Sequence, residues 1–351
     1  MSESKISANF SKWTWGISTL ALAVVFFLIF VFRTWHNFVE APIAQGEEPK
    51  VVVIQKGDNA SKVAQRLEQA GVLDKPDYFV WYLRYVEKHH LLKAGEFSIS
   101  PTWKPARLVD ELLTGKTVQY PVTLIAGQTF KQTLSTLEAL PKIQRELDFS
   151  DVEALQALFG VDKPISKKYP YANLEGLLLP ETYHYQQGDS DKQILLRAYR
   201  AMQSELDAAW KQRSKDLPLS TPYEVLILAS IVEKETGHAP ERAKIAGVFE
   251  NRLKKKMRLQ TDPTIIYGME ARYKGNIRKK DIREKTDYNT YQIDGLPPTP
   301  IALPSKAAIW AVAQPEKTDA LFFVAKGGGQ HYFSKTLEEH NRAVRKYLLT
   351  K

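Results

Sequence analysis

The sequence of 351 residues contains no cysteine. This absence excludes disulfide scaffolds, cysteine-ligated zinc or iron–sulfur sites, and every thiol nucleophile. The sequence also lacks the glycine-rich loop that binds nucleotide phosphates, the paired-histidine motif of zinc proteases and the Gly-x-Ser-x-Gly turn of serine hydrolases. Its seven histidines are scattered along the chain. We therefore expect no metal ion and no cofactor.

The composition is that of an ordinary globular protein, with 44% hydrophobic and 25% charged residues, which excludes wholesale disorder. The length predicts two domains, or one large domain with an accessory module. There are 49 Lys and Arg against 40 Asp and Glu, a net charge of +9. This excess favours an acidic partner, either nucleic acid, anionic lipid or an anionic polymer.

A run of 20 residues without charge, 13–32, lies near the N-terminus. As a helix rising about 1.5 Å per residue, it spans a hydrocarbon core of about 30 Å. Trp13, Trp15 and Trp35 flank the run, as in an interfacial aromatic belt. The alternative is a cleaved signal peptide, but its apolar core would be shorter, and no small-x-small site follows Phe32 at the usual distance. The sequence therefore predicts a retained transmembrane helix.

The charges around this run indicate its orientation. Lys5, Lys12 and the terminal amine precede it, whereas only Arg33 follows closely. The positive-inside rule then predicts a cytoplasmic tail at 1–12 and a body outside the membrane. Nucleic acid is not an expected partner there. Residues 33–50 end in a stretch with two prolines and a glycine and are expected to form a linker.

Two similar segments follow, each with a strand, a glycine and a helix. The first has a β-branched strand at 51–54 and a helix at about 60–70, and the second has a strand at 122–125 before Gly127. Neither unit can bury its own apolar face, so each must pack on something. The Lys-Gly-Asp turn at 56–58 resembles the opening of a LysM module, a small fold that binds amino-sugar glycans. The alternative is a mixed α+β packing domain.

Helical patterns dominate the rest of the chain, at 191–215 and 223–236. Residues 321–324 and 331–333 flank three glycines and predict a hairpin, and a helix at 337–349 closes the chain. The predicted fold class is therefore α+β, with an N-terminal transmembrane helix, a small α/β subdomain and a helix-rich α+β domain.

One predicted helix carries two carboxylates at its end. Thr221 and Glu224 predict a capping box at its start, and Gly237 predicts a left-handed cap at its end. The helix is apolar all round from 225 to 232 except for one serine, which indicates a path through the interior. Glu233 and Glu235 then follow in the last turn.

The end of a helix is unfavourable for anions, because the helix dipole is negative there. We expect burial and the dipole together to raise the pKa of a glutamate at this place, as a general acid for glycosidic cleavage requires. Glu233 and Glu235 are about 200° apart around the helix, so only one can face a given cleft. The alternative is that both are exposed charges at a frayed helix end.

The chain closely resembles the endolytic murein transglycosylases of the YceG-like family. The resemblance is ordered, covers about residues 50–345, and rests on long strings. These strings are Ala229-Ser-Ile-Val-Glu-Lys-Glu-Thr236, Val248-Phe-x-Asn-Arg-Leu253, Met257-Arg-Leu-Gln-Thr-Asp-Pro-Thr264 with Tyr267-Gly268, Tyr288-Asn-Thr-Tyr291, Gly295-Leu-Pro-Pro-x-Pro-Ile301, and Leu174-Glu-Gly176 with Pro180-Glu-Thr-Tyr183.

The resemblance implies a lyase that cuts nascent peptidoglycan strands internally and thereby terminates their elongation. It assigns the catalytic role to Glu235, the second glutamate of the Glu-Lys-Glu string. It also implies a LysM-like glycan-binding subdomain at 51–118 and a catalytic domain at 119–351, outside the bacterial cytoplasmic (inner) membrane. Two departures from the family pattern, Glu181 and Thr299, do not touch the proposed acid.

Three functions are compatible with these residues. In a lytic transglycosylase, Glu235 protonates the bond between N-acetylmuramic acid (MurNAc) and N-acetylglucosamine (GlcNAc), and the muramoyl 6-hydroxyl then closes a 1,6-anhydro ring. In a muramidase-type hydrolase, Glu233, Glu175, Glu181 or Asp262 would activate water. The third function is a catalytically silent, membrane-tethered scaffold that binds glycan.

Polar and aromatic side chains in the family strings are candidates for binding the sugars: Glu175, Gln260, Asp262, Tyr267, Tyr288, Asn289 and Tyr291. The alternative for each is packing around neighbouring turns. The expected partners are peptidoglycan strands, the membrane through a single pass, and peptidoglycan synthases of elongation or division. Without Glu3, Lys5 and Lys12, the rest of the chain has a charge of +8, which would attract it to the carboxylates of murein.

Overall fold

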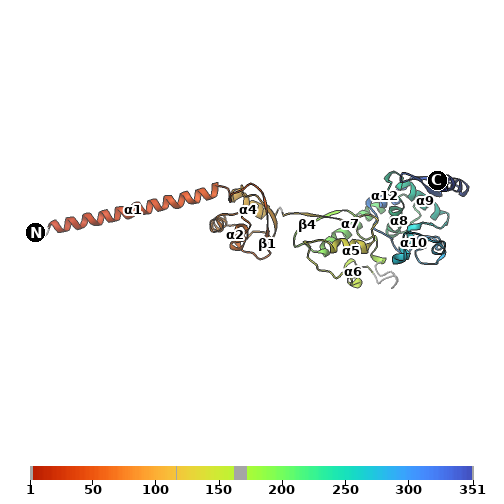
Figure 1. The fold of residues 1–351 in the computed structure, drawn as a ribbon, viewed down its shortest axis with the longest axis horizontal. Helices are drawn as coiled ribbons and strands as arrows, with labels where there is room; N and C mark the ends of the chain where they lie inside the picture. The colour runs from red at the N-terminus through yellow and green to blue at the C-terminus, as the bar shows by residue number, and fades with distance from the viewer. Residues whose placement is uncertain (1–2, 116, 162–171, 350–351) are drawn as a thin grey trace. The chain divides into compact units, whose positions relative to one another are not determined.

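A computed structural model describes residues 3–115, 117–161 and 172–349, except for the side chains of 3–18 and 172. The chain divides into two compact units, Met1–Gln119 and Tyr120–Lys351 (Figure 1). This division lies one residue beyond the expected boundary at 118. The α+β fold class is confirmed, because short antiparallel strand pairs alternate with many helices in both units.

The N-terminal helix α1 covers Glu3–Glu40. Its part from Thr19 to Glu40 contains an exposed 18-residue stretch with a mean hydropathy of 1.8, and it is long and apolar enough to cross a membrane. It is the one such helix among the described residues, and a signal sequence near an N-terminus can meet the same criterion of length and composition. Lys5, Lys12, Trp13 and Trp15 have side chains that lie outside the described part of the chain.

The helix continues beyond the expected span, so the predicted linker at 33–50 is wrong for its first eight residues. Its last turns are apolar on one side, and this side packs on the first unit. Phe38 is buried there, and the ring of Trp35 lies 6.3 Å from that of Tyr82. Packing of these side chains explains why the helix extends to Glu40.

After α1, the rest of the first unit has one antiparallel strand pair and three helices. Its elements are β1 (Lys50–Ile54), α2 (Ala60–Gln69), α3 (Pro76–Tyr85), β2 (Gly95–Ile99) and α4 (Pro105–Thr114). The strand and helix predicted at 51–54 and 60–70 are both present. β1 pairs with β2 so that Val52 faces Phe97, and both side chains enter a core that the helices share.

The second unit contains two antiparallel strand pairs. β3 (Tyr120–Thr123) pairs with β4 (Thr182–Tyr185), and β5 (Phe322–Gly327) pairs with β6 (Gln330–Ser334). The predicted hairpin is thus confirmed, and Gly328 and Gly329 have the positive φ angles that its turn requires. β3 begins and ends two residues earlier than the predicted strand at 122–125.

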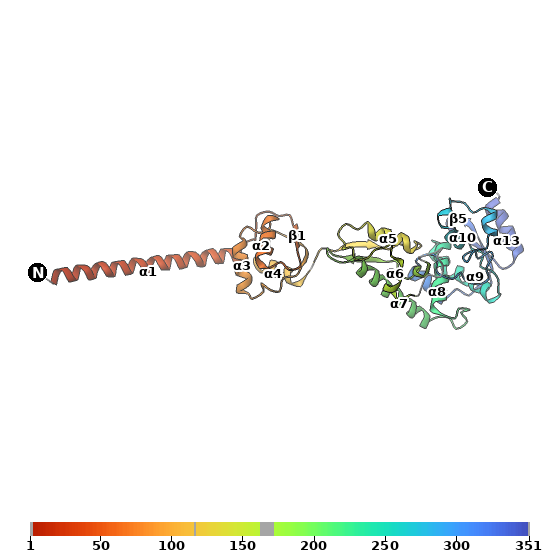
Figure 2. The ribbon, with the colours of Figure 1, turned by 90° about the horizontal axis from the view of Figure 1, so that it is seen from below.

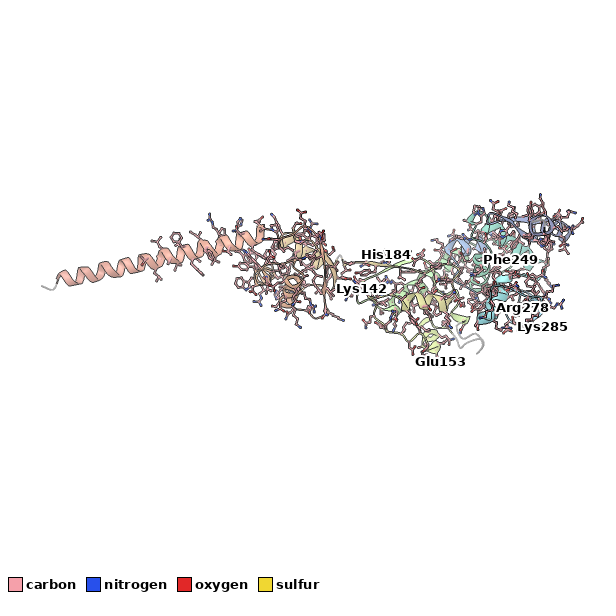
Figure 3. The ribbon with its side chains drawn as sticks, viewed as in Figure 1. Lys142, Glu153, His184, Phe249, Arg278 and Lys285 are labelled. Atoms are coloured by element: carbon pink, nitrogen blue, oxygen red, sulfur yellow. The ribbon has the colours of Figure 1, made fainter. Side chains whose placement is uncertain are left out.

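The helices of the second unit are α5 (Phe130–Glu138), α6 (Val152–Phe159), α7 (Asp191–Lys211), α8 (Pro222–Glu235), α9 (Arg242–Lys254), α10 (Asp262–Met269), α11 (Lys279–Arg283), α12 (Lys306–Ala313) and α13 (Leu337–Val344). A π-helical segment, Arg345–Leu349, follows α13 where one continuous helix was expected. α8 is the central helix, because α7, α9, α10 and α12 all contact it (Figure 2). Phe249 on α9 (Figure 3) lies in the hydrophobic core of the second unit, where its ring centre is 5.7 Å from that of Phe323.

The two ends of α8 differ in part from the prediction. Thr221 caps the start by accepting from the Glu224 N–H, but the Glu224 carboxylate accepts from the N–H of Ser220 instead of completing the capping box. The left-handed cap predicted at Gly237 is wrong, because Thr236 ends the helix with extended backbone. The Thr236 hydroxyl accepts from the His238 N–H, and the chain turns without a left-handed conformation at Gly237.

Candidate active site

Glu235 is the last residue of α8 and is partly buried. Its carboxylate accepts a short hydrogen bond from the hydroxyl of Thr261. Burial raises the pKa of Glu235, the Thr261 hydrogen bond opposes this, and the nearby charge of Asp262 raises it further. His331 and Arg252 act weakly in the lowering direction. The net result is a raised pKa, so this carboxyl can hold a proton at a higher pH than an exposed glutamate.

Thr261 owes its position to a buried threonine cluster. Its backbone N–H donates to the Thr290 hydroxyl at 3.0 Å, and its carbonyl accepts from the Thr264 hydroxyl at 2.7 Å. Thr261 is the N-cap residue of α10, but its side chain does not cap that helix, because the hydroxyl donates to Glu235 instead. Gln260, just before it, is exposed and has a φ of 50°, a left-handed conformation that costs energy outside glycine.

Two predicted site residues lie beside Glu235. Asp262 is exposed at the start of α10 and accepts from the Tyr291 hydroxyl at 2.8 Å. Tyr291 is also within electrostatic reach of Glu235, and burial followed by the Asp262 charge raises the pKa of its phenol. The Tyr291 carbonyl accepts from Arg258 at 2.9 Å, which fixes the loop that carries the ring.

The sequence reasoning missed Thr261, Arg252 and His331 as residues around Glu235. Arg252 is only 7% exposed, and its guanidinium donates to the carbonyls of Leu259 and Leu321 at 2.7 Å each. It thereby ties α9 to the segment before Thr261. Thr261 and Arg252 both stand in the family strings.

His331 reaches the surroundings of Glu235 from β6. Its Nδ1 lies 2.9 Å from a carboxylate oxygen of Glu241, and its backbone N–H donates to the same carboxylate. The imidazole is therefore oriented by Glu241. No local sequence pattern pairs these two residues, because 90 positions separate them.

Glu233 has different partners from Glu235, as their spacing around the helix predicts. Its carboxylate accepts from both the N–H and the hydroxyl of Ser305, the N-cap residue of α12. An Arg242 nitrogen lies 3.9 Å away. Glu233 therefore joins α8 to the starts of α9 and α12.

Glu175, Tyr267 and Tyr288 form a second, buried cluster. Glu175 is 2% exposed and accepts from the Phe130 N–H at 2.8 Å and from the Tyr267 hydroxyl at 3.3 Å. Burial raises the pKa of Glu175 to about 8. The rings of Tyr267 and Tyr288 lie 4.8 Å apart, and Tyr288 shares a hydrogen bond of 2.7 Å with Thr299.

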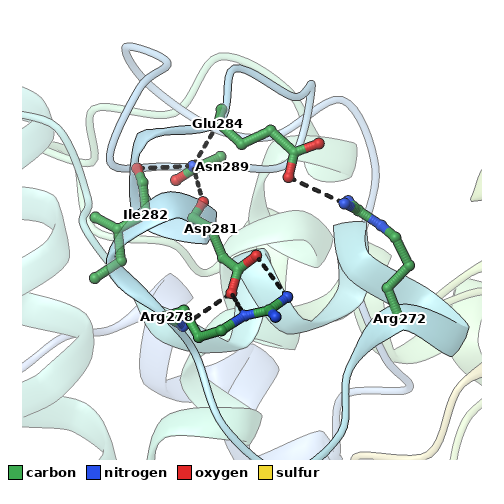
Figure 4. A network of polar contacts seen from close by, with 6 residues as sticks. All are labelled: Arg272, Arg278, Asp281, Ile282, Glu284 and Asn289. Atoms are coloured by element: carbon green, nitrogen blue, oxygen red, sulfur yellow. Dashed lines mark hydrogen bonds and ion pairs between the residues drawn. The ribbon is translucent and has the colours of Figure 1, made fainter.

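Asn289 is buried in the loop after α11 (Figure 4). Its side-chain nitrogen donates to the carbonyls of Asp281, Ile282 and Glu284, and its Oδ1 accepts from the Tyr291 N–H. Asn289 therefore has its hydrogen-bonding groups occupied within the chain and holds the loop that presents Tyr291.

The predicted residues thus fall into three groups. Asp262 and Tyr291 lie around Glu235, with Gln260 exposed beside them in the chain. Glu175, Tyr267 and Tyr288 lie together elsewhere in the second unit, and Asn289 supports a loop. In the part of the chain that the structure describes, no group of three or more His, Asp or Glu side chains could hold a metal ion.

Comparisons with known proteins identify the family of the chain. Residues 52–346 match the YceG-like family. A Bacillus subtilis (strain 168) protein named endolytic murein transglycosylase is 31% identical over 307 residues, 85% of this chain and 84% of that protein. A protein of the same name from Streptococcus pneumoniae (strain D39) is 30% identical over 337 residues, 88% of this chain but only 60% of that longer protein.

A solved structure is also similar. The crystal structure of a YceG-like protein from Listeria monocytogenes matches with a TM-score of 0.52 and 31% identity, over 85% of this chain and 100% of that one. The family match covers well over half of the sequence, and the relatives align across both units. The chain therefore belongs to the YceG-like family.

Proposed function

We propose that this enzyme is an endolytic lytic transglycosylase that cleaves peptidoglycan strands with Glu235 as its acid and base. The observation that carries the proposal is the Glu235 carboxyl, which is partly buried at the end of α8, hydrogen-bonded to Thr261 and raised in pKa. The relatives named endolytic murein transglycosylase support the choice of substrate.

The reaction needs one group that donates and then accepts a proton. Protonated Glu235 gives its proton to the oxygen that links MurNAc to GlcNAc, and the bond from C1 to that oxygen breaks. The carboxylate then takes the proton of the muramoyl 6-hydroxyl, whose oxygen bonds to C1 and gives a 1,6-anhydro end. An internal nucleophile has an effective concentration of about 10⁵–10⁸ M, so no water has to be activated.

The geometry suggests separate roles for the other predicted residues. Asp262 and Tyr291 lie close to Glu235, and Gln260 is exposed next to Thr261, so we assign contacts with sugar hydroxyls to these three. Tyr288 and Asn289 are each 1% exposed. We assign them, with Glu175 and Tyr267, to the framework that holds the site.

A hydrolase is the second candidate. The observation that favours it is an exposed carboxylate, that of Asp262, close to Glu235. Of the carboxylates that could activate water, Glu233 is bound by Ser305, and Glu175 is buried with Tyr267. Asp262 is exposed and close enough for its charge to raise the pKa of Glu235. The hydrogen bond from Tyr291 holds the Asp262 carboxylate in place.

The remaining proposals concern location and glycan binding. We propose that residues 13–32 of α1 anchor the chain in the bacterial cytoplasmic membrane with residues 1–12 inside, and that 51–118 is a LysM-like glycan-binding subdomain. The apolar stretch of α1 supports the anchor. The strand and helix flanking the turn at 56–58 are compatible with the LysM-like assignment.

The proposed role of Glu235 is tested by E235Q on purified murein, with E233Q as the matched control on the same helix turn. The proposed transglycosylase mechanism predicts that E235Q still binds the glycan but releases no fragments, because an amide cannot donate and recover the proton. E233Q should cleave, since Glu233 contacts Ser305 and Arg242. Full cleavage by E235Q would refute the assignment of Glu235. No cleavage by either the wild type or E235Q would favour the silent-scaffold alternative.

A further inference from the structure

The first unit exposes a cluster of aromatic rings where α3 packs on the end of α1. Trp81 and Tyr85 of α3 are 55% and 75% exposed. The Tyr85 ring lies 6.0 Å from that of Trp35 on α1, and the Trp81 ring lies 5.5 Å from that of Tyr78. We call Trp35, Tyr78, Trp81 and Tyr85 the aromatic rim.

The spacing along α3 places these rings on one side of the helix. Positions 78, 81 and 85 follow the three- and four-residue steps that share a helix face. Tyr82, on the same side, is buried against Trp35 and Phe38. The rim is therefore the outer continuation of the contact between α3 and α1, and nothing within the described part of this unit covers Trp81 or Tyr85.

The position of Trp35 along α1 sets the level of the rim. The apolar run ends at Phe32, and Trp35 lies three residues further, about 4.5 Å along the helix axis. The headgroup layer on each side of a bilayer is about 5–7 Å thick. A bilayer crossed by 13–32 therefore places Trp35 in its headgroup layer, and the contact with Trp35 brings Tyr85 close to the same level.

The side chains around the rim suit this layer. Tyr and Trp prefer the membrane interface because each combines a large apolar ring with a polar group. Arg33 and Arg84 are exposed beside the rings, and the Lys75 ammonium lies 5.6 Å from the Tyr78 ring centre. Asp77 and Glu87 carry the opposite charge, so the rings rather than the net charge distinguish this surface.

We propose that the aromatic rim inserts into the headgroup layer of the bilayer that α1 crosses. The first unit is then held at the membrane by α3 as well as by α1. This inference rests on the proposed anchor but concerns a surface that does not include Glu235. Binding of glycan by the same rings is the competing use, and it gives no reason for their contact with the end of the apolar helix.

The absence of cysteine makes a direct test possible. Single-cysteine variants W81C, R84C, S98C and F26C of the full chain are labelled with a nitroxide and inserted into vesicles of phosphatidylethanolamine and phosphatidylglycerol. Collision of each label with oxygen and with a water-soluble nickel chelate gives its depth. R84C leaves all four rim rings in place. Ser98 is exposed on β2, whose partner β1 lies away from α1 in Figure 2, and it serves as the aqueous control.

The proposal predicts a nickel collision rate for labels at 81 and 84 several-fold lower than at 98, with the label at 26 deeper still. Equal nickel access at 81, 84 and 98, with 26 deep, would overturn the rim proposal while leaving the anchor intact. Equal nickel access at all four positions would overturn both the rim proposal and the proposed anchor. Protection of 81 and 84 that appears only after glycan strands are added would assign the rim to glycan.

Discussion

Thr261 and Asp262 are adjacent residues that act on Glu235 in opposite directions. The Thr261 hydroxyl donates to the carboxylate and favours its charged form, whereas the negative charge of Asp262 favours the protonated form. Burial of the carboxyl exceeds both effects and sets the net direction. The pKa of the proposed catalytic acid is therefore adjustable by single substitutions at its two neighbours.

Removing the Thr261 hydroxyl should raise the pKa of Glu235 further. Activity requires the protonated acid, so it falls as pH rises through that pKa. In T261V this alkaline limb of the rate profile should therefore move to higher pH. The control T264V removes a hydroxyl that contacts the Thr261 carbonyl and not Glu235. An unmoved limb in T261V would contradict the role of this hydrogen bond.

Removing the charge of Asp262 should have the opposite effect. In D262N the pKa of Glu235 should fall, so the alkaline limb of kcat/KM should move to lower pH. D294N is the matched control, because Asp294 is an exposed aspartate that pairs with Arg258 at 2.9 Å. If D262N instead abolished cleavage while leaving glycan binding intact, Asp262 would be the base of a hydrolase.

The sequence sufficed to propose which glutamate is the acid, but it did not predict the surroundings of that glutamate. The family string containing Glu235 selected one of two glutamates, and the helix period required that they face different partners. Thr261 follows Glu235 by 26 positions, and His331 comes from a separate hairpin. Contacts of this kind depend on how α8, α10 and β6 pack, and the spacing of residues in the sequence does not predict that packing.

At the level of elements, the first residue of α5 is hydrogen-bonded to a buried carboxyl. The Phe130 N–H at the first position of α5 donates to Glu175, which is also bonded to Tyr267 of α10. Because burial raises the pKa of Glu175 to about 8, the folded chain binds this proton more tightly than the unfolded chain does. Its contribution to stability is therefore complete at pH below about 4.5 and is lost as pH rises toward 8.

Replacing Glu175 by a neutral isostere should remove this dependence. Between pH 5 and pH 8 the wild type should lose up to about 1.4 kcal/mol of unfolding free energy per pH unit through Glu175, and E175Q should lose less. Denaturant unfolding across this range measures the slope. E181Q, at an exposed glutamate of the same segment, should keep the wild-type slope. Parallel slopes for wild type and E175Q would contradict the raised pKa.

The elements themselves were largely predictable, because their apolar periods and caps are local. The start of α8 follows from Thr221 and Pro222, and the hairpin of β5 and β6 follows from its glycines. The end of α8 was not predictable from Gly237, because the Thr236 side chain supplies the turn. The extension of α1 to Glu40 depends on packing of Phe38 against residues far along the chain.

At the scale of the whole molecule, two units with separate cores follow a helix that could cross a membrane. The charge of +9 was at first compatible with nucleic acid, lipid or an acidic polymer. Family membership and the raised pKa of Glu235 favour the acidic polymer of the cell wall. The lack of cysteine fits the proposed chemistry, which needs only one carboxyl for both proton transfers.

The mass of the glycan ends made by the full-length enzyme tests this account most directly. Murein strands are digested with wild type and with E235Q, and the new ends are measured by mass spectrometry. The account predicts 1,6-anhydro-MurNAc ends from the wild type, with no water added, and none from E235Q. New ends one water heavier than the anhydro form would show that water attacks C1, and would contradict the intramolecular reaction proposed for Glu235.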